Sequence, residues 1–391
     1  MLNSDTVRED SIIQLCERLR EHGIDIWSSS ESLPEEVMQQ FVSLDKEAQV
    51  DEPRAEELLG AGVIHELPKD ALRIDLRHFV DGSPKTVNVG FLLGNRGIFC
   101  PVALSHVGAA AVAFDFDKRR WRETGFLEKY LILVSTDVAM GIGVSVTGKW
   151  KLEDPLSHQK ENPPSQKDKR QVNLTDTAEM RAAAVRRARR RMKNCEKELV
   201  QTLSERYSEE WIAVDGTLFD IEGYSEGTLF DIEKEIRVVG ISKSFTLDPI
   251  VRKGGKQENI GYLGGLLRNL EVGHRSPVYE LTPDKNHRDR YTYMWFIRIH
   301  PARQSPVSGI VKVELPPSKC YLDDREELRK TVDGLSHAIF RMRTPYLYDN
   351  RRGESFLYPI YVAETLVKSK LSSVEKLRGI WAYNLRRAGG R

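Results

Sequence analysis

Apolar residues recur along the chain at two spacings, one typical of helices and one of strands. Steps of three and four predict helices within about the first 65 residues, at 176–207, at 325–342 and at 358–385, the last broken near Ser372. Short apolar runs bounded by turn residues predict strands at 72–80, 86–93, 97–104, 109–115, 130–135, 211–214, 237–241, 292–299 and 309–315. This order predicts an α/β protein, a mixed sheet flanked by helices. We expect an acidic helical region over 1–68, then a main domain over 69–391 with a polar loop at about 151–174.

Two of the predicted strands end in an aspartate that is followed by glycine and a hydroxyl residue. The segments are Asp81-Gly82-Ser83 and Asp215-Gly216-Thr217. Asp-Gly is also the commonest tight-turn dipeptide, so for either segment alone a turn is the favoured interpretation, and the helix between the two segments is what raises the pair. Carboxylates at the ends of adjacent strands would suit a site that holds divalent metal against a phosphodiester.

The helix between these segments supplies a third carboxylate. Asp176 and Glu179 form a capping-box pattern at its start. Glu196 falls on the apolar stripe, whereas Glu198 points about 200° away by the helical period and faces water. A buried carboxylate is costly unless it is paired or bound to a cation, so Glu196 is the candidate ligand. The alternative is a glutamate at the edge of the stripe that reaches solvent.

Composition narrows the class of protein. The chain has 391 residues, 40% of them hydrophobic and 30% charged, which is ordinary for a soluble protein. Its four cysteines form no CxxC pair, which argues against a disulfide framework or a zinc site and suits a reducing cytoplasm. No signal peptide or membrane span is indicated. Oxygen ligands without cysteine favour manganese or magnesium.

Charge is distributed unevenly along the sequence. Residues 1–60 carry fifteen acidic against five basic side chains, a net charge of −10, so the rest carries about +11. The basic part would attract a polyanion, and the acidic part would suit a protein partner or form a solvated cap. Seven basic residues and no acidic one lie between Arg181 and Lys193. Within this run the candidate nucleic-acid contacts are Arg186, Arg187, Arg189 and Arg190, although a solvated face is the alternative.

Two other motifs carry no assigned chemistry. Residues 143–150 imitate a phosphate-binding loop, but Trp150 stands where a metal-binding hydroxyl is needed, so nucleotide binding is rejected. The segment Gly-Thr-Leu-Phe-Asp-Ile-Glu occurs at 216–222 and again at 227–233, which indicates a local duplication because a solenoid needs at least three copies.

The order of motifs resembles the NurA nucleases over roughly residues 70–385. The segments that carry the resemblance are Asp81-Gly82-Ser83, the arginine-rich helix with Glu196, 214–217, 238–243, 295–300 and Tyr358-Pro359. The resemblance implies an RNase H-like core and a manganese-dependent DNA exonuclease and endonuclease. It also implies a homodimer that works with the hexameric ATPase HerA in DNA end resection, a repair step, or in antiviral defence against phage.

The resemblance also assigns roles to residues. It implies that Asp81, Glu196 and Asp215 bind metal, that Lys243 lies near the scissile phosphate, and that Tyr358 belongs to the C-terminal motif. The family has a histidine where this chain has Leu366.

Because of that departure, the identity of the fourth metal ligand stays open. Glu364 or His300 takes the place of the family histidine, or the fourth ligand is missing. Two hypotheses therefore stand: a metal-dependent DNase, and a DNA-binding adaptor of the translocase that is catalytically weak or inactive.

Overall fold

The computed structural model describes most of the chain. The described residues are 10–22, 24–28, 54–59, 64–93, 99–115, 117–135, 148–156, 176–218, 237–245, 250–253, 256–257, 260–282, 292–303, 305–344 and 357–389. The repeated heptapeptide beyond residue 218, the phosphate-loop-like segment before residue 148 and most of the predicted polar loop lie outside them.

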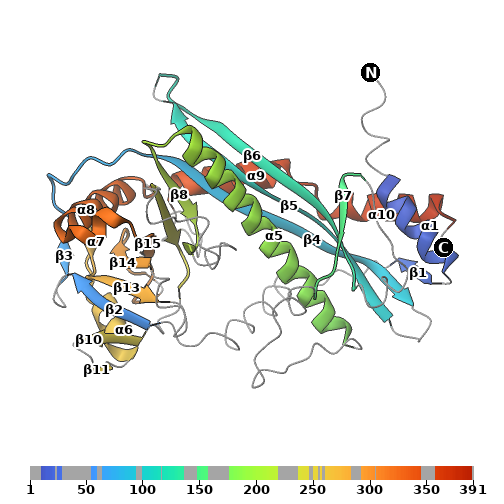
Figure 1. The fold of residues 1–391 in the computed structure, drawn as a ribbon, viewed down its shortest axis with the longest axis horizontal. Coiled ribbons are helices and arrows are strands. Elements are labelled where there is room, and N and C mark those ends of the chain that lie inside the picture. Colours follow the sequence, from blue (N-terminus) through green and yellow to red (C-terminus); the bar gives the residue numbers. More distant parts are fainter. Residues whose placement is uncertain are drawn as a thin grey trace.

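The described strands form one large mixed sheet (Figure 1). Its path is β11 (Lys256–Gln257), β10 (Ile250–Lys253), β2 (Arg54–Leu59), β13 (Val278–Thr282), β14 (Thr292–Arg298), β15 (Ile310–Leu315), β9 (Val238–Ser242), β8 (Trp211–Asp215), β4 (Leu76–Leu93), β5 (Phe99–Asp115), β6 (Arg120–Leu133) and β7 (Trp150–Glu153). Off this path, β1 (Asp25–Ser28) pairs with β4, and β12 (His274–Arg275) pairs with β14 and β3 (His65–Glu66). Most pairs are antiparallel, but β4, β8 and β9 run parallel to one another, and the pairs β2–β10 and β6–β7 are also parallel. The predicted α/β class with a mixed sheet is confirmed, and it is compatible with an RNase H-like fold.

Helices cover both faces of the sheet. The long helix α5 (Thr177–Arg206) crosses β4, β5 and β6 on one face, and α9 (Tyr358–Lys370) packs on β4 and β5 from the other (Figure 1). The remaining helices are α1 (Asp10–Glu21), α6 (Ile260–Arg268), α7 (Lys319–Asp323), α8 (Arg325–Arg341) and α10 (Val374–Arg387). No helix in the described ranges is long and apolar enough to cross a membrane.

Several predicted boundaries are confirmed. The Asp176 side chain caps α5 by accepting hydrogen bonds from the backbone N–H groups of Ala178 and Glu179. The two C-terminal helices are separated by residues 371–373, as the predicted break near Ser372 requires. Strands β8, β9, β14 and β15 begin and end within about one residue of their predicted bounds.

One prediction about Asp81 is wrong: it does not end a strand. The predicted strands at 72–80 and 86–93 are the single strand β4, which runs through Asp81, Gly82, Ser83 and Pro84. The runs at 97–104 and 109–115 are likewise the single strand β5. Among the described residues, β4 pairs at Pro84 with β5 only, and a one-sided position is where a strand tolerates proline.

The N-terminal region is only partly helical, which corrects a second prediction. Its described helix is α1, whereas β1, β2 and β3 belong to the large sheet. The buried side chains of Ile12, Leu15 and Leu19 form one apolar cluster with Leu377 and Trp381 of α10. The start of the described chain is thus packed against its end.

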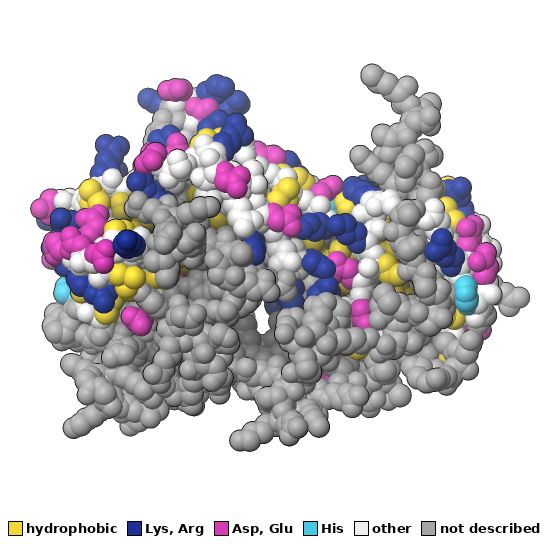
Figure 2. All heavy atoms as spheres, viewed as in Figure 1, with side chains coloured by type: hydrophobic (Ala, Val, Ile, Leu, Met, Phe, Trp, Pro, Cys, Tyr) yellow, Lys and Arg dark blue, Asp and Glu magenta, His cyan; other side chains and the backbone are white. Residues whose placement is uncertain are grey.

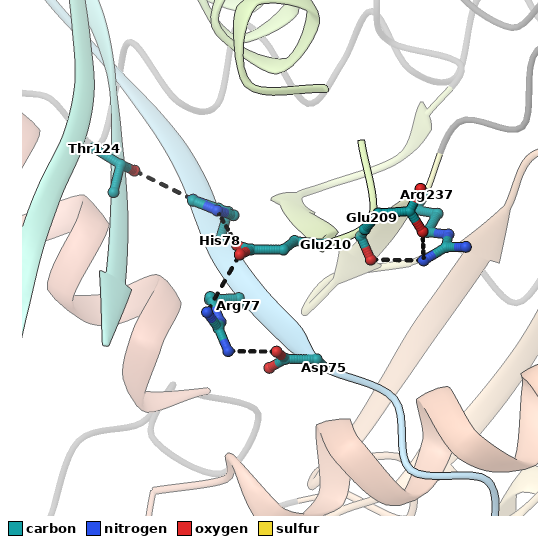
Figure 3. A network of polar contacts seen from close by, with 7 residues as sticks. All are labelled: Asp75, Arg77, His78, Thr124, Glu209, Glu210 and Arg237. Carbon is teal, nitrogen blue, oxygen red and sulfur yellow. Dashed lines mark hydrogen bonds and ion pairs between the residues drawn. The ribbon is translucent and has the colours of Figure 1, made fainter. Parts of the chain in front are cut away.

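A polar network fixes the start of β4 close to Asp81 (Figure 3). The buried His78 bonds through Nε2 to Glu210 Oε2 at 2.7 Å, and its ring lies against Tyr207 at the end of α5. Arg77 bridges Glu210 and Asp75. These contacts tie β4 to the connection between α5 and β8.

A second buried histidine fixes the break between α9 and α10. His106 Nδ1 accepts a hydrogen bond from the Ser372 backbone N–H at 2.9 Å, so Nε2 carries the proton that bonds Glu128 at 3.0 Å. Burial lowers the pKa of His106 to about 4 against the opposing effect of Glu128, and Lys149 and Lys376 lower it further. A second proton would sit on Nδ1 and face the Ser372 N–H.

We expect the protein to lose stability on acidification through His106. Between pH 6.5 and about 4, His106 is protonated in the unfolded chain but neutral in the folded protein. The free energy of unfolding therefore falls as the pH falls through this range. The contribution between pH 7 and pH 5 is about 2 kcal/mol. Urea unfolding should show a weaker pH dependence for His106→Gln than for wild type. His22→Gln, at an exposed histidine, is the control; parallel wild-type and His106→Gln profiles would contradict the expectation.

Candidate functional site

Strand register places Asp81, Asp215 and Lys243 next to one another. Val80 of β4 pairs with Val214 of β8 in parallel, so the two aspartates that follow are neighbours. Asp215 pairs in turn with Ile241 of β9, and Lys243 follows two residues later. Lys243 Nζ lies 3.3 Å from Asp215 Oδ1.

These side chains lie on the face of the sheet that α9 covers. Phe79 and Ala213, two residues before the aspartates, belong to the apolar cluster that contains Ile360 and Ala363 of α9. Because side chains alternate along a strand, Asp81 and Asp215 share that face. The next residue of α9, Glu364, has Oε2 4.0 Å from Lys243 Nζ and Oε1 2.6 Å from Lys368 Nζ.

Glu196 approaches from the opposite face. Val80 and Val214 pack with Met192 and Cys195 of α5, and Gly82 lies on that same side by alternation. A Cβ atom on Gly82 would lie 2.5 Å from Glu196 Oε1. Glu196 is fully buried, and Glu198 is half-exposed and pairs with Lys129, as the helical period predicts. Gly82 is therefore required by close packing and not by a turn.

Lys193 connects α5 to the end of β8. Its Nζ lies 2.7 Å from Glu196 Oε2 and donates a hydrogen bond to the Asp215 backbone carbonyl at 3.0 Å. Gly216, with φ +100°, lies beneath it, and a Cβ there would approach Lys193 Nζ at 3.1 Å. In the sequence Lys193 is one of seven residues in a basic run, and the signal for its role is its position three residues before Glu196, which is the spacing of a helical ion pair.

The turn after Asp215 is held by another buried carboxylate that sequence reasoning missed. Glu314 of β15 accepts hydrogen bonds from Thr217 Oγ1 at 2.6 Å and from the Leu218 N–H at 2.8 Å, and it pairs with Lys312. The sequence feature that indicates this buried carboxylate is the pair of charged positions, 312 and 314, within an otherwise apolar predicted strand.

Negative charge is crowded around Asp81. Burial raises the pKa of Asp81 well above its usual range, and the charge of Asp215 raises it further. Lys243 opposes this shift, whereas Glu196 and Glu364 add to it. A divalent cation would relieve the repulsion, and the all-oxygen donors fit magnesium or manganese. Within the described part of the chain, however, no three acidic, histidine or cysteine side chains are arranged closely enough to form a ready metal site.

Other predicted residues lie apart from this cluster. Tyr358 is half-exposed at the start of α9, about 9 Å along the helix axis before Glu364, and its ring contacts Trp121. The buried His300 follows the end of β14, two strands from β9 in the sheet order. Leu366 is partly buried against the apolar core, whereas Glu364 is the α9 residue whose carboxylate lies 4.0 Å from Lys243 Nζ.

The predicted arginine contacts lie along α5. Arg187 Nε pairs with Glu153 Oε2 at 2.8 Å, and Arg191 binds the same oxygen at 2.7 Å. Arg187 is thus engaged in a contact with β7. Arg186, Arg189 and Arg190 are partly exposed.

Comparison with known proteins identifies one family. The model of the NurA domain matches residues 78–366, which is 289 of the 391 residues. The match spans the strands that carry both aspartates, all of α5, and α9 as far as Leu366. A search of curated proteins found no match.

We expect Gly82→Ala to displace Glu196. The added methyl group would meet Glu196 Oε1 at 2.5 Å and Met192 Cγ at 2.8 Å, so the fold should lose about 1–3 kcal/mol. Thermal or urea unfolding measures this loss. Gly379→Ala is the control, because a Cβ on this exposed helical glycine meets nothing within 4 Å and the change should be neutral or stabilising. Equal effects of the two changes would contradict the packing argument.

Removal of Glu314 should loosen the turn that carries Asp215. Glu314→Ala leaves Lys312 without its buried partner and should cost about 3 kcal/mol or more in free energy of unfolding. Glu314→Gln retains an oxygen acceptor for Leu218 and should cost less. Glu326→Ala, which breaks an exposed ion pair with Arg329, is the control and should change little. A Glu314→Ala protein as stable as wild type would refute this role.

Proposed function

The chain belongs to the NurA family, a nuclease family associated with HerA, and from this premise we propose that it is a metal-dependent DNA nuclease. The observation that carries the proposal is the placement of Asp81 and Asp215 side by side on parallel strands, with Lys243 and Glu364 beside them. Adjacent carboxylates with a nearby cation suit the hydrolysis of a phosphodiester.

Asp81, Asp215 and Glu196 are the residues proposed to hold the metal, with Glu364 as a further ligand in place of the family histidine. A bound manganese or magnesium would supply an activated water and neutralise charge on the phosphate. Binding would require Glu196 and Asp215 to shift partly away from their lysines, since both are paired in the structure.

The lysines have separate proposed roles. Lys243 Nζ lies beside Asp215 and would neutralise charge that develops on the phosphate oxygens. Lys193 lies on the other face and would hold Glu196 and the Asp215 backbone in place. Tyr358 and His300 are less well placed for a direct role, because their described contacts lie away from the aspartates.

The partner assignments follow from the family. We propose DNA as the substrate, a HerA-type hexameric ATPase as the partner, a homodimer as the assembly, and DNA end processing or defence against phage as the context. The acidic N-terminal region remains a proposed docking element. Its exposed acidic residues on α1, Glu17 and Glu21, allow this to be tested by charge reversal without removal of strands from the sheet.

A second candidate is a DNA-binding adaptor of the ATPase with weak or no cleavage. The observation that favours it is that Lys193 and Lys243 already neutralise Glu196 and Asp215, while Leu366 replaces the family histidine. It predicts DNA binding without metal-dependent cleavage, whether or not the ATPase is present.

Cleavage of linear duplex DNA in manganese distinguishes the two functions. Wild type should cleave, and Asp81→Asn and Asp215→Asn should each lose on the order of 100-fold or more in rate, because each removes a proposed ligand. Both variants should stay folded, since each removes a negative charge from a crowded cluster. Glu198→Gln, on the exposed side of the same helix as Glu196, is the control and should cleave at the wild-type rate.

Each outcome decides between the proposals. Equal cleavage by wild type and both asparagine variants would overturn the assigned site. Binding without cleavage by the wild type, also in the presence of the ATPase, would establish the adaptor in place of the nuclease.

A further inference from the structure

The hairpin that joins β5 to β6 carries a concentrated positive charge. Lys118, Arg119, Arg120 and Arg122 are all exposed, and none forms an ion pair with another described residue. Asp115 and Asp117 are the acidic residues between positions 115 and 122, which leaves this segment with a net charge of +2, and the Asp115 side chain accepts a hydrogen bond from the Lys118 backbone N–H at 3.1 Å. Lys and Arg side chains gather, with some acidic side chains among them, at the projecting end of the molecule above β6, where the hairpin lies (Figure 2). By contrast, Arg187 and Arg191 of the arginine-rich helix are occupied by Glu153.

Aromatic packing fixes the base of this hairpin on the protein core. The Trp121 ring contacts Phe114 across the hairpin at 5.3 Å and the buried Phe79 at 5.9 Å between centroids. It also contacts Tyr358 of α9 at 6.1 Å. Phe79 lies two residues before Asp81 on β4, so the hairpin and the proposed catalytic aspartate share one support. The cations are therefore presented in a fixed position relative to the site.

Strand register gives the distance between the hairpin and Asp81. Ala110 of β5 pairs with Asp81, and Asp115, the last residue of β5, lies five residues further on. At about 3.4 Å per residue this is about 17 Å. Successive base pairs of B-form DNA are about 3.4 Å apart, so this distance corresponds to about five base pairs, half a helical turn.

We propose that the β5–β6 hairpin is a second contact for the substrate duplex, which binds backbone phosphates about five base pairs from the bond that is cut. The inference rests on the proposed function and adds a binding surface to it. Positive charge on a two-stranded ribbon suits a duplex, because such a ribbon fits the major groove and its cations reach the flanking phosphates. The contact would fix the position of the duplex without reading its sequence.

The test is the salt dependence of DNA binding. The variant Lys118→Gln, Arg119→Gln, Arg120→Gln, Arg122→Gln is titrated against a fluorescent 24-base-pair duplex in EDTA, so that binding is measured without cleavage. Each lost phosphate contact should reduce the magnitude of the negative slope of log K against log salt by about 0.9, so the loss of four contacts should reduce it by about 3.6 and lower affinity near 0.1 M salt by about tenfold or more. Equal melting temperatures for the variant and wild type would show that the fold is retained.

The matched control removes the same charge elsewhere. Lys69, Arg73, Lys319 and Lys330 are also exposed, and their joint change to Gln should leave the slope near that of wild type. Equal losses in both variants would overturn the inference, because overall charge alone would then account for binding. An unchanged slope in the hairpin variant would also overturn the inference. If that variant in addition no longer captures the ATPase, the hairpin would be assigned to the protein partner. If wild type itself fails to bind duplex, the proposed function fails together with the inference.

Discussion

The contact between Glu196 and Gly82 determines where the other groups of the site can lie. A carboxylate on the buried face of α5 meets the middle of β4 at a distance that leaves no room for a side chain. Desolvation of that carboxylate is costly without a partner, and Lys193 supplies one. Because the same ammonium group binds the Asp215 carbonyl, the end of β8 is fixed relative to α5. Helix, central strand and strand end are thus connected through one ion pair.

The length of each strand explains how charged groups from the two faces of the sheet come close enough to influence one another. Strand β4 continues past Asp81, whereas β8 ends at Asp215, so the chain beside Gly82 turns away at Gly216. Two glycines therefore lie where the strands diverge, and the α5 side chains cover them. Asp81 and Asp215 face α9 on the other side, and Asp81 still experiences the charge of Glu196. Buried networks at His78 and Glu314 hold the surrounding backbone and so limit relaxation of this repulsion.

Local features of the fold were predictable from sequence, and features that depend on long-range pairing were not. The period of α5 separates Glu196 from Glu198 because both lie on one rigid element. The sequence around Asp81 has the same residues as a turn, yet it forms a strand because β5 pairs with it along its length. A glycine required by a turn and one required by a neighbouring carboxylate cannot be told apart in a single sequence.

The strands β1, β2 and β3 were not predicted for a related reason, since their partners lie far along the chain. Glu364 was an open alternative at the sequence level, and the packing of Leu366 into the core shows which of these α9 residues faces Lys243.

The distribution of lysine side chains indicates which carboxylate is most available to a metal ion. Among the described residues, Glu196, Asp215 and Glu364 each have a lysine within 4.0 Å. Asp81 has no such ion pair; it accepts a hydrogen bond from the Gly82 N–H and is the group whose pKa is raised well above its usual range. Lys243 attracts Asp81 without forming an ion pair with it, so a cation bound at Asp81 would displace no such pair, whereas at the other three carboxylates it would compete with an existing pair. Asp81 is therefore the carboxylate best placed to hold the proposed metal, and Glu196 and Asp215 would have to give up lysine contacts to hold it as well.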